Sequence, residues 1–267
     1  MPTISVDKYA SIQCGRCVLV CPGSLLAQKS PKHYPEPIPD ADSHCIACGH
    51  CVAICPVDAM EIGSLSGRDC EPLAKETAPR FEHIATLVRG RRSVRRFVPE
   101  PVDPQQIEQL IDVVRWAPTA RNALPVRWTV VHSPETVREL AGLVVEFFRR
   151  ADTLPELVAA WDAGYDGVLR DAPCLVIASA GKDALWPEVD CTIAVETLDL
   201  CATAMRLGAC WAGYFIRAAA QEPTIAQRLG FEDGERVYAA LMIGRPLEAE
   251  VYSRAPYRPQ PSVRWIS

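Results

Sequence analysis

Four cysteines near the N-terminus have the spacing of iron–sulfur ligands. They read C-x2-C-x2-C-x3-C-P and are Cys45, Cys48, Cys51 and Cys55, followed by Pro56. The first three can wrap the backbone around one centre, while the fourth reaches to a second cluster. A zinc ribbon would instead need two separated C-x2-C pairs. The spacing therefore predicts clusters that pass electrons one at a time.

A second copy of this motif lies upstream and lacks one cysteine. Cys14, Cys17 and Cys21 repeat the spacing ahead of Pro22, with Ser11 where the first cysteine would stand. The segment is therefore an internal duplication, as in two-cluster ferredoxins, and predicts two clusters with crossed ligation. The expected ligands are Cys45, Cys48, Cys51 and Cys21 for cluster A, and Cys14, Cys17 and Cys55 for cluster B.

The fourth ligand of cluster B stays open at this point. Ser11 can bind iron through its oxygen, or the position can be empty and leave a three-iron cluster, or Cys70 from outside both motifs can supply a thiolate. Serine oxygen is harder and less acidic than thiolate, which makes it a poorer ligand in a sulfide cluster. The rest of the motif is intact and would hold Ser11 near the open iron. We therefore favour a four-iron cluster with Ser11 or a solvent oxygen at the fourth site.

Length, composition and net charge limit the classes of protein and of partner that are possible. The chain has 267 residues, 49% of them hydrophobic and 23% charged, which predicts a soluble protein with one large and one small domain. A net charge of −5 argues against nucleic acid or an anionic membrane surface as a partner. We expect no membrane span and no signal peptide. Seven of the twelve cysteines fall in cluster spacing, which favours the reducing cytoplasm.

The sequence divides into three segments. Residues 1–67 hold both cysteine motifs, residues 68–80 form a polar linker, and residues 81–267 form a larger domain. Apolar periodicity and proline positions predict alternating helices and strands in that domain. The expected helices begin at Pro104 and cover Pro134–Arg150 and Asp190–Leu207, and the expected strands are Trp128–Val131, Cys174–Ala178 and Tyr238–Ile243.

Short motifs in the larger domain resemble those of the nitroreductase family of FMN-dependent oxidoreductases. Each motif is weak alone, but their order and spacing are specific. Together with the cysteine motifs, they resemble ferredoxin-fused nitroreductase-like proteins. The resemblance implies an α+β fold with a central, mostly antiparallel sheet between helices, and an intertwined homodimer with FMN at the subunit interface. The matching segments are residues 91–95, 117–122, 212–215, 243–246 and the tail ending in Trp265.

The resemblance also implies which residues bind FMN. A basic turn is suited to the phosphate and ribityl groups because arginine can bind phosphate in a bidentate manner. A glycine would let the backbone approach the flavin. The residue before that glycine is often acidic in the family but is Ala212 here. The alternatives are a solvated basic face and, for Asn122, a simple turn-forming role. The implied FMN residues are Arg91, Arg92, Ser93, Arg95, Pro118, Thr119, Asn122, Gly213, Arg254 and Arg258.

Two functions follow from this combination. The first is an FMN-dependent oxidoreductase that passes electrons from the clusters to FMN and on to a flat acceptor, such as a nitroaromatic, a quinone or an activated alkene. No side chain is assigned as catalytic because flavin N5 would perform the chemistry. The expected donor is reduced ferredoxin or another low-potential donor, and use of NAD(P)H stays open. The alternative is an electron-transfer or redox-sensing module that acts on a protein partner.

Overall fold

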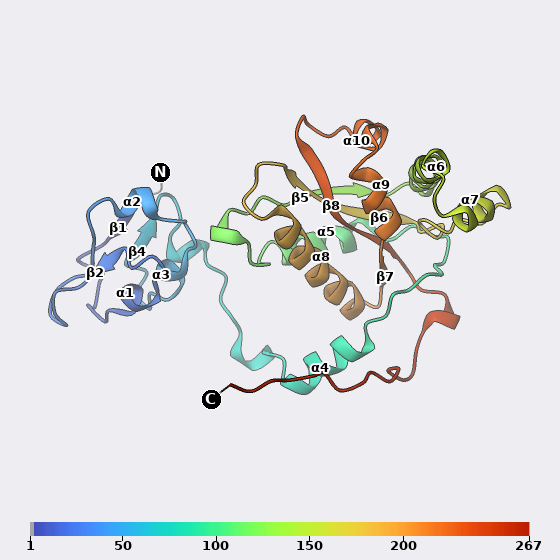
Figure 1. Ribbon diagram of the computed structural model, residues 1–267. Helices are drawn as coiled ribbons and strands as arrows, with labels where there is room; N and C mark the ends of the chain where they lie inside the picture. The colour runs from blue at the N-terminus through green and yellow to red at the C-terminus, as the bar shows by residue number, and fades with distance from the viewer. Residues whose placement is uncertain (1–2, 267) are drawn as a thin grey trace. The chain divides into compact units, whose positions relative to one another are not determined.

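The computed structural model describes residues 3–266, which divide into two compact units (Figure 1). The first unit runs to Ala78 and includes Arg121–Ala123. The second takes Pro79–Ala120 and the chain from Leu124 onward. No helix in the described part of the chain is long and apolar enough to cross a membrane. Each unit is described by itself below.

The first unit is built from two antiparallel strand pairs and three short helices. Its small core consists of aliphatic side chains with Cys17 and Cys51 among them, so the cysteines are part of the packing. Strand β1 pairs with β4, and β2 pairs with β3. The bounds are β1 Ile4–Val6, α1 Arg16–Val20, β2 Leu26–Ala27, β3 Glu36–Pro37, α2 Ala41–His44, α3 His50–Ala53 and β4 Met60–Ile62.

The internal duplication is visible in the backbone. Gly15 and Gly49, 34 residues apart, both have φ of +72° and directly precede α1 and α3. Gln13 and Ala47, also 34 residues apart, have φ of +60° and +49°. Left-handed conformations are uncommon for residues other than glycine. Their recurrence at matching positions shows that both motif copies wrap the chain in the same way.

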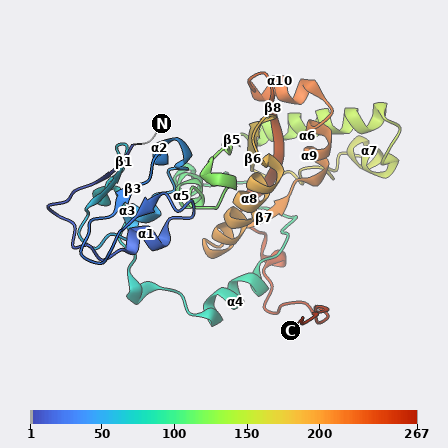
Figure 2. The ribbon, with the colours of Figure 1, turned by 60° about the vertical axis from the view of Figure 1, so that its left-hand side comes forward.

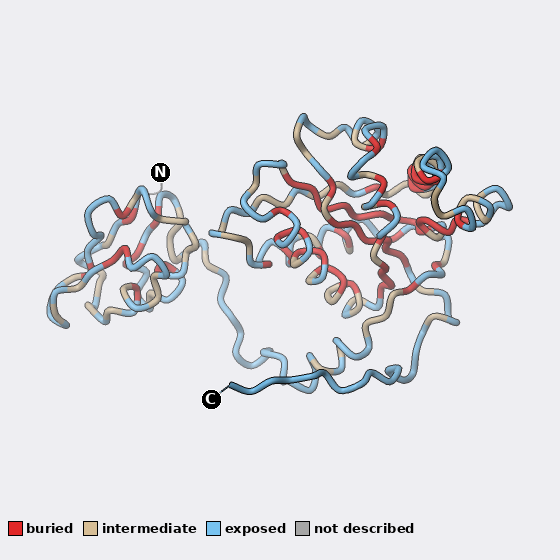
Figure 3. The backbone as a smooth tube through the Cα atoms, viewed as in Figure 1, coloured by how far each residue is buried: buried red, intermediate tan, exposed pale blue. Residues whose placement is uncertain are grey.

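The expected linker is exposed and only partly regular. It contains two turns of 3-10 helix, Gly67–Asp69 and Lys75–Thr77. Ser66 and Asp69 form a reciprocal capping box around the first turn, which satisfies two backbone donors. Residues 71–80 are all exposed and are drawn in pale blue in Figure 3. This stretch therefore adds little apolar packing.

The second unit is organised around a four-stranded sheet. The strand order is β5-β6-β8-β7 and every pair is antiparallel, as the family resemblance implied. The two central strands are buried along nearly their whole length and appear red in Figure 3. The bounds are β5 Arg127–Val131, β6 Cys174–Gly181, β7 Gly208–Trp211 and β8 Glu235–Gly244.

Helices cover both faces of this sheet. Alternate residues of β6 point to opposite faces: Leu175 and Ile177 pack in one core with α6 and α9, and Val176 and Ala178 pack in the other with α5 and α8. Figure 2 shows α8 on one side of the central strands and α6 and α9 on the other. The bounds are α5 Pro104–Val114, α6 Pro134–Arg150, α8 Pro187–Ala204 and α9 Gly213–Ala219.

Proline and capping signals located most of these helices from sequence. The carboxylate of Asp103 accepts a hydrogen bond from the Gln105 N–H at 2.9 Å and caps α5. Helix α6 has the expected bounds. Helix α8 begins and ends three residues earlier than expected, because Pro187 occupies its first turn and Arg206 adopts a left-handed φ of +60° after its end. Strand β7 and helix α9 were not foreseen, since both are short.

Two further helices complete the unit, and a third starts it. Helix α4 begins the unit and has no buried residue. The chain from Val251 to Ile266 is likewise exposed throughout. Both segments carry large apolar side chains, so both present unburied apolar surface. The bounds are α4 Phe81–Gly90, α7 Pro155–Asp162 and α10 Pro223–Leu229.

The start of β7 yields a packing prediction. A Cβ added at Gly208 would lie 2.7 Å from Cγ1 and 2.8 Å from Cβ of Val94. Val94 is buried and its N–H donates to the Ala209 carbonyl at 2.9 Å, so it cannot easily move away. We expect Gly208→Ala to lower the free energy of unfolding by about 1–3 kcal/mol, measured by urea denaturation. Gly90→Ala, in α4 with open space around it, serves as the control. Equal unfolding midpoints for the two variants would refute this close packing.

Candidate functional site

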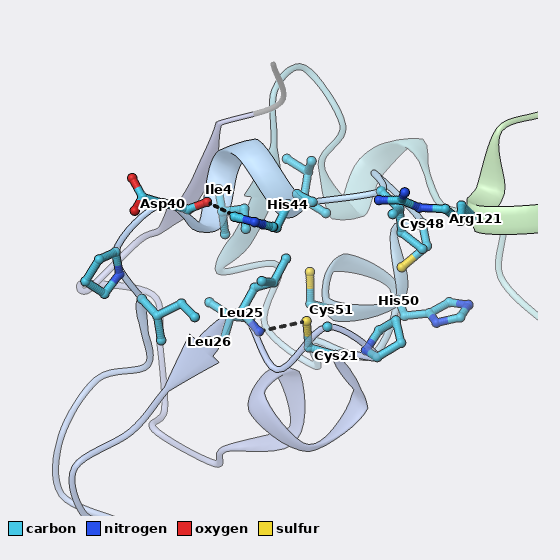
Figure 4. Close-up of a pocket in the computed structure, with 17 residues that line it drawn as sticks. Ile4, Cys21, Leu25, Leu26, Asp40, His44, Cys48, His50, Cys51 and Arg121 are labelled. Carbon is cyan, nitrogen blue, oxygen red and sulfur yellow. Dashed lines mark hydrogen bonds between the residues drawn. The ribbon is translucent and has the colours of Figure 1, made fainter.

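Four cysteines line one cavity in the first unit, which we call site A. The cavity has a volume of about 610 Å³, and Cys21, Cys45, Cys48 and Cys51 all border it. Cys21 comes from the upstream motif and the other three from the downstream motif. Figure 4 shows the sulfur atoms of Cys21, Cys48 and Cys51 turned toward the same space. The structure thus brings together the side chains that crossed ligation assigns to cluster A.

A second, narrower cavity, site B, collects the remaining motif cysteines. It is lined by Cys14, Cys17 and Cys55 together with Ser11, and Cys70 does not border it. Its volume is about 20 Å³, room for about one water molecule. A cluster at this site would require the cavity to widen. In donor chemistry the set offers three soft sulfur atoms and one hydroxyl.

Matching hydrogen bonds reach the sulfur that ends each motif. The Leu25 N–H donates to Sγ of Cys21 at 3.3 Å, and the Ala59 N–H donates to Sγ of Cys55 at 3.2 Å. Both bonds span four residues, which again follows the duplication. An N–H donor stabilises negative charge on sulfur. Each site therefore has a backbone donor at the sulfur contributed by the other motif.

Burial acts in the opposite direction on two of the thiols. Desolvation, followed by the nearby Cys48, Cys21 and Cys45, raises the pKa of Cys51 to about 11. Desolvation is also the main reason why the pKa of Cys17 is raised. A metal must displace these protons to bind.

The donor chemistry of site A fits an iron–sulfur cluster. Within residues 3–266, no group of three or more His, Cys, Asp or Glu side chains could hold a single metal ion. At site A four sulfur atoms instead border a sizeable cavity. Thiolate ligands are those that hold iron–sulfur clusters in proteins.

In the second unit, the basic turn of residues 91–95 lies along strand β7. Ser93 forms a parallel bridge with Ala209. The guanidinium Nε of Arg92 donates to the Arg91 carbonyl at 2.6 Å, and Nη1 of Arg95 donates to the Ser93 carbonyl at 3.1 Å. Arg95 is exposed, and Arg92 and Ser93 are half-buried. The turn therefore presents several hydrogen-bond donors beside β7, the edge strand of the sheet.

Arg91 is held by a buried carboxylate. Its Nη1 lies 3.1 Å from Oδ2 of Asp199 on helix α8. The Asp199 side chain is fully buried, and its Oδ1 has no hydrogen-bond partner. Burial raises the pKa of Asp199 to about 6, although the Arg91 charge lowers it and Glu196 raises it slightly further. Asp199 keeps one guanidinium N–H of Arg91 in place.

A second buried acid on α8 holds the turn at residues 117–120. Oδ1 of Asp190 accepts a hydrogen bond from the Ala120 N–H at 2.9 Å, and its Oδ2 is buried without a partner. Oγ1 of Thr119 accepts one from the Leu124 N–H at 3.0 Å, and Pro118 is exposed. Neither acid was predicted from the sequence. The available signal was an acidic residue on the buried face of an apolar helix.

The other residues implied for FMN lie outside the basic turn, and their role in binding FMN stays a prediction. Asn122 belongs to the first unit, where its amide donates to the Ile46 and Ala47 carbonyls at 3.3 Å. Gly213 begins α9 and has nothing within 4 Å of the position that a Cβ would take, so this side of its backbone is open. Arg254 and Arg258 are exposed and form no hydrogen bond or ion pair with the described residues.

The Arg91–Asp199 pair predicts a specific pH dependence. Because the pKa of Asp199 is raised from its ordinary 3.8 to about 6, the folded chain holds a proton there that the unfolded chain releases. This group therefore makes the free energy of unfolding fall as pH rises from about 4 to about 6. Asp199→Asn should remove that contribution, as measured by urea denaturation across this range. Glu188→Gln, exposed near the start of the same helix, should leave it in place, and an identical pH slope in both variants would contradict the assignment.

Comparison with known proteins identifies the family. The model of the nitroreductase family matches residues 88–245, and that of the 4Fe-4S dicluster domain matches residues 11–60. A Streptomyces coelicolor protein provisionally named NADH dehydrogenase/NAD(P)H nitroreductase SCO5049 is 29% identical over 181 residues. This alignment covers 64% of the present chain and 88% of the relative.

Solved structures share the fold of the second unit. A nitroreductase with bound FMN from Bacteroides fragilis superimposes with a TM-score of 0.62 at 20% identity, covering 69% of this chain and 98% of its own. Iodotyrosine deiodinase bound to FMN and 3-iodo-L-tyrosine gives a TM-score of 0.55 at 18% identity, covering 69% and 99%. The family match spans more than half of the sequence. The chain therefore belongs to the nitroreductase family, and it is an oxidoreductase with a 4Fe-4S dicluster domain ahead of the family's fold.

Proposed function

We propose that this protein is an FMN-dependent oxidoreductase supplied with electrons by its own iron–sulfur clusters. One observation carries the proposal: a single chain joins two cysteine-lined cavities to a nitroreductase-family fold. Two of the solved structures that share this fold hold FMN. The proposed acceptor is small and flat, such as a nitroaromatic, a quinone or an activated alkene.

In this proposal the basic turn binds the phosphate end of FMN. Arg92, Ser93 and Arg95 supply N–H and O–H donors at the surface of the turn, and Arg91 adds a guanidinium already oriented by Asp199. The open space at Gly213 suits the flat ring system. When bound, FMN accepts single electrons and delivers a hydride or an electron pair. The chain's own task is to orient the flavin and the acceptor.

The proposed active form is a homodimer. Helix α4 exposes Phe81 and Ile84, and the tail exposes Tyr257, Trp265 and Ile266. Apolar side chains at this density on two extended segments call for a covering surface, and a second copy of the chain supplies one by symmetry. A tail that crosses to the other subunit would bring Arg258 to the partner's flavin.

The proposed donor is reduced ferredoxin or another low-potential donor, because iron–sulfur clusters accept electrons singly. The name of the Streptomyces relative points to NAD(P)H as a second candidate donor. Supplying each donor separately to anaerobic protein and following the flavin absorbance decides between them. Small acceptors tested in the same assay define the substrate class.

Arg95 provides a clean test of FMN binding. It is exposed and has no ion pair with the described residues, so its removal disturbs the fold less than loss of Arg91. A lost charge-assisted hydrogen bond to phosphate costs about 1.5–3 kcal/mol, so Arg95→Ala should weaken FMN binding roughly 10- to 100-fold, measured by flavin fluorescence titration. Arg96→Ala, the exposed neighbour, is the matched control. Unchanged FMN affinity in Arg95→Ala would count against the basic turn as the phosphate site.

Electron entry is tested at site A. Cys48→Ala removes one sulfur from that cavity and should abolish turnover with ferredoxin-type donors while FMN stays bound. Cys70→Ser, outside both cavities, should keep full turnover. Equal donor-driven rates in the two variants would show that the clusters are dispensable. Electron delivery to a protein partner without turnover of small acceptors would instead support an electron-transfer module.

A further inference from the structure

We infer that Ser11 is the fourth ligand of the second cluster and binds one of its irons through Oγ. The inference rests on the proposed function, since it requires a cluster at site B. Of the three possibilities that the sequence leaves open for this ligand, we select the Oγ atom of Ser11. Site B then becomes a site with three thiolates and one alkoxide.

Ser11 occupies the position in its motif that Cys45 occupies in the other motif. Ser11 stands 34 residues before Cys45, the spacing that also relates Cys14 to Cys48 and Cys17 to Cys51. The backbone repeats its left-handed conformations at this same spacing. Residues wrapped in the same way place their side chains in the same way. Accordingly, Ser11 borders site B just as Cys45 borders site A.

Two backbone hydrogen bonds hold Ser11 in place. Its N–H donates to the Asp7 carbonyl at 2.9 Å, which anchors the residue next to strand β1. Its Oγ accepts a hydrogen bond from the Gln13 N–H at 3.3 Å. A backbone donor aimed at this oxygen favours its charged form. On binding, the hydroxyl releases its proton to solvent, and an Oγ–iron bond takes the place of the O–H bond.

The competing thiol is held elsewhere. Cys70 does not border site B, and its Sγ lies 3.8 Å from the Ser66 carbonyl, to which it donates. The turn that carries it is closed by Asp69, whose carboxylate accepts from the Ser66 N–H at 2.8 Å. Moving Cys70 to site B would open this capping box. Ser11 needs no such rearrangement.

An oxygen ligand has an electronic consequence. Alkoxide is a harder ligand than thiolate and favours the more oxidised state of iron. Ligand identity is one of the means by which a protein sets the potential of a cluster. Cluster B is therefore expected to be reduced at a lower potential with Ser11 than with a cysteine at this position.

The test compares the full-length chain with three variants, all purified without exposure to air. Wild type should contain about eight irons per chain and give no signal of an oxidised three-iron cluster in electron paramagnetic resonance. Ser11→Ala should lose about one iron and show that signal. Ser11→Cys should keep all the iron and shift the midpoint potential of one cluster upward in a redox titration. Ser5→Ala, in strand β1 and not among the residues that line either cavity, should match wild type.

Three results would overturn the inference. One is a three-iron signal in never-aerated wild type. Another is a full iron content in the Ser11→Ala variant, because a solvent oxygen would then be sufficient as the fourth ligand. The last is a midpoint potential that does not move in Ser11→Cys. Absence of the clusters looks different, because wild type would then hold no iron or sulfide, and the proposed function would fail together with the inference.

Discussion

Two carboxylates on one buried helix fix both loops of the candidate flavin site. Asp199 holds the guanidinium of Arg91, and Asp190 holds the N–H of Ala120. Each acid keeps one oxygen buried without a partner, which is costly unless the surroundings compensate. The packing of helix α8 against the central sheet offsets this unfavourable free energy. The loops at residues 91–95 and 117–120, which carry implied FMN residues, are thereby attached to a helix packed against the central sheet.

The first unit depends on a different constraint, namely backbone wrapping around sulfur. Its strands are only two or three residues long, and its core includes cysteine side chains. Left-handed residues at matching positions turn each motif so that its side chains converge on a cavity. Such a unit gains stability from bound metal, because ligand binding to the folded form adds directly to the free energy of unfolding.

The sequence predicted those features that depend on local chemistry. Cysteine spacing, the Asp103 cap with Pro104, and the apolar run of β6 each reflect a short-range rule, and the corresponding elements were located correctly. Asp190 and Asp199 were missed because their partners lie about 70 and 108 residues away in sequence. The approach of Gly208 to Val94 is likewise a tertiary contact without a local signal. The predicted roles of Arg254 and Arg258 rest on the family resemblance, because neither residue forms a hydrogen bond or ion pair with the described residues.

The proposed function requires that one chain pass electrons from its iron–sulfur clusters to FMN. An anaerobic rapid-mixing experiment with a one-electron donor tests it most directly, with cluster and flavin absorbance followed in the same sample. We expect cluster bleaching to come first and flavin reduction to follow at a rate independent of protein concentration, because the transfer occurs within one molecule. Clusters that become fully reduced while the flavin stays oxidised would contradict it.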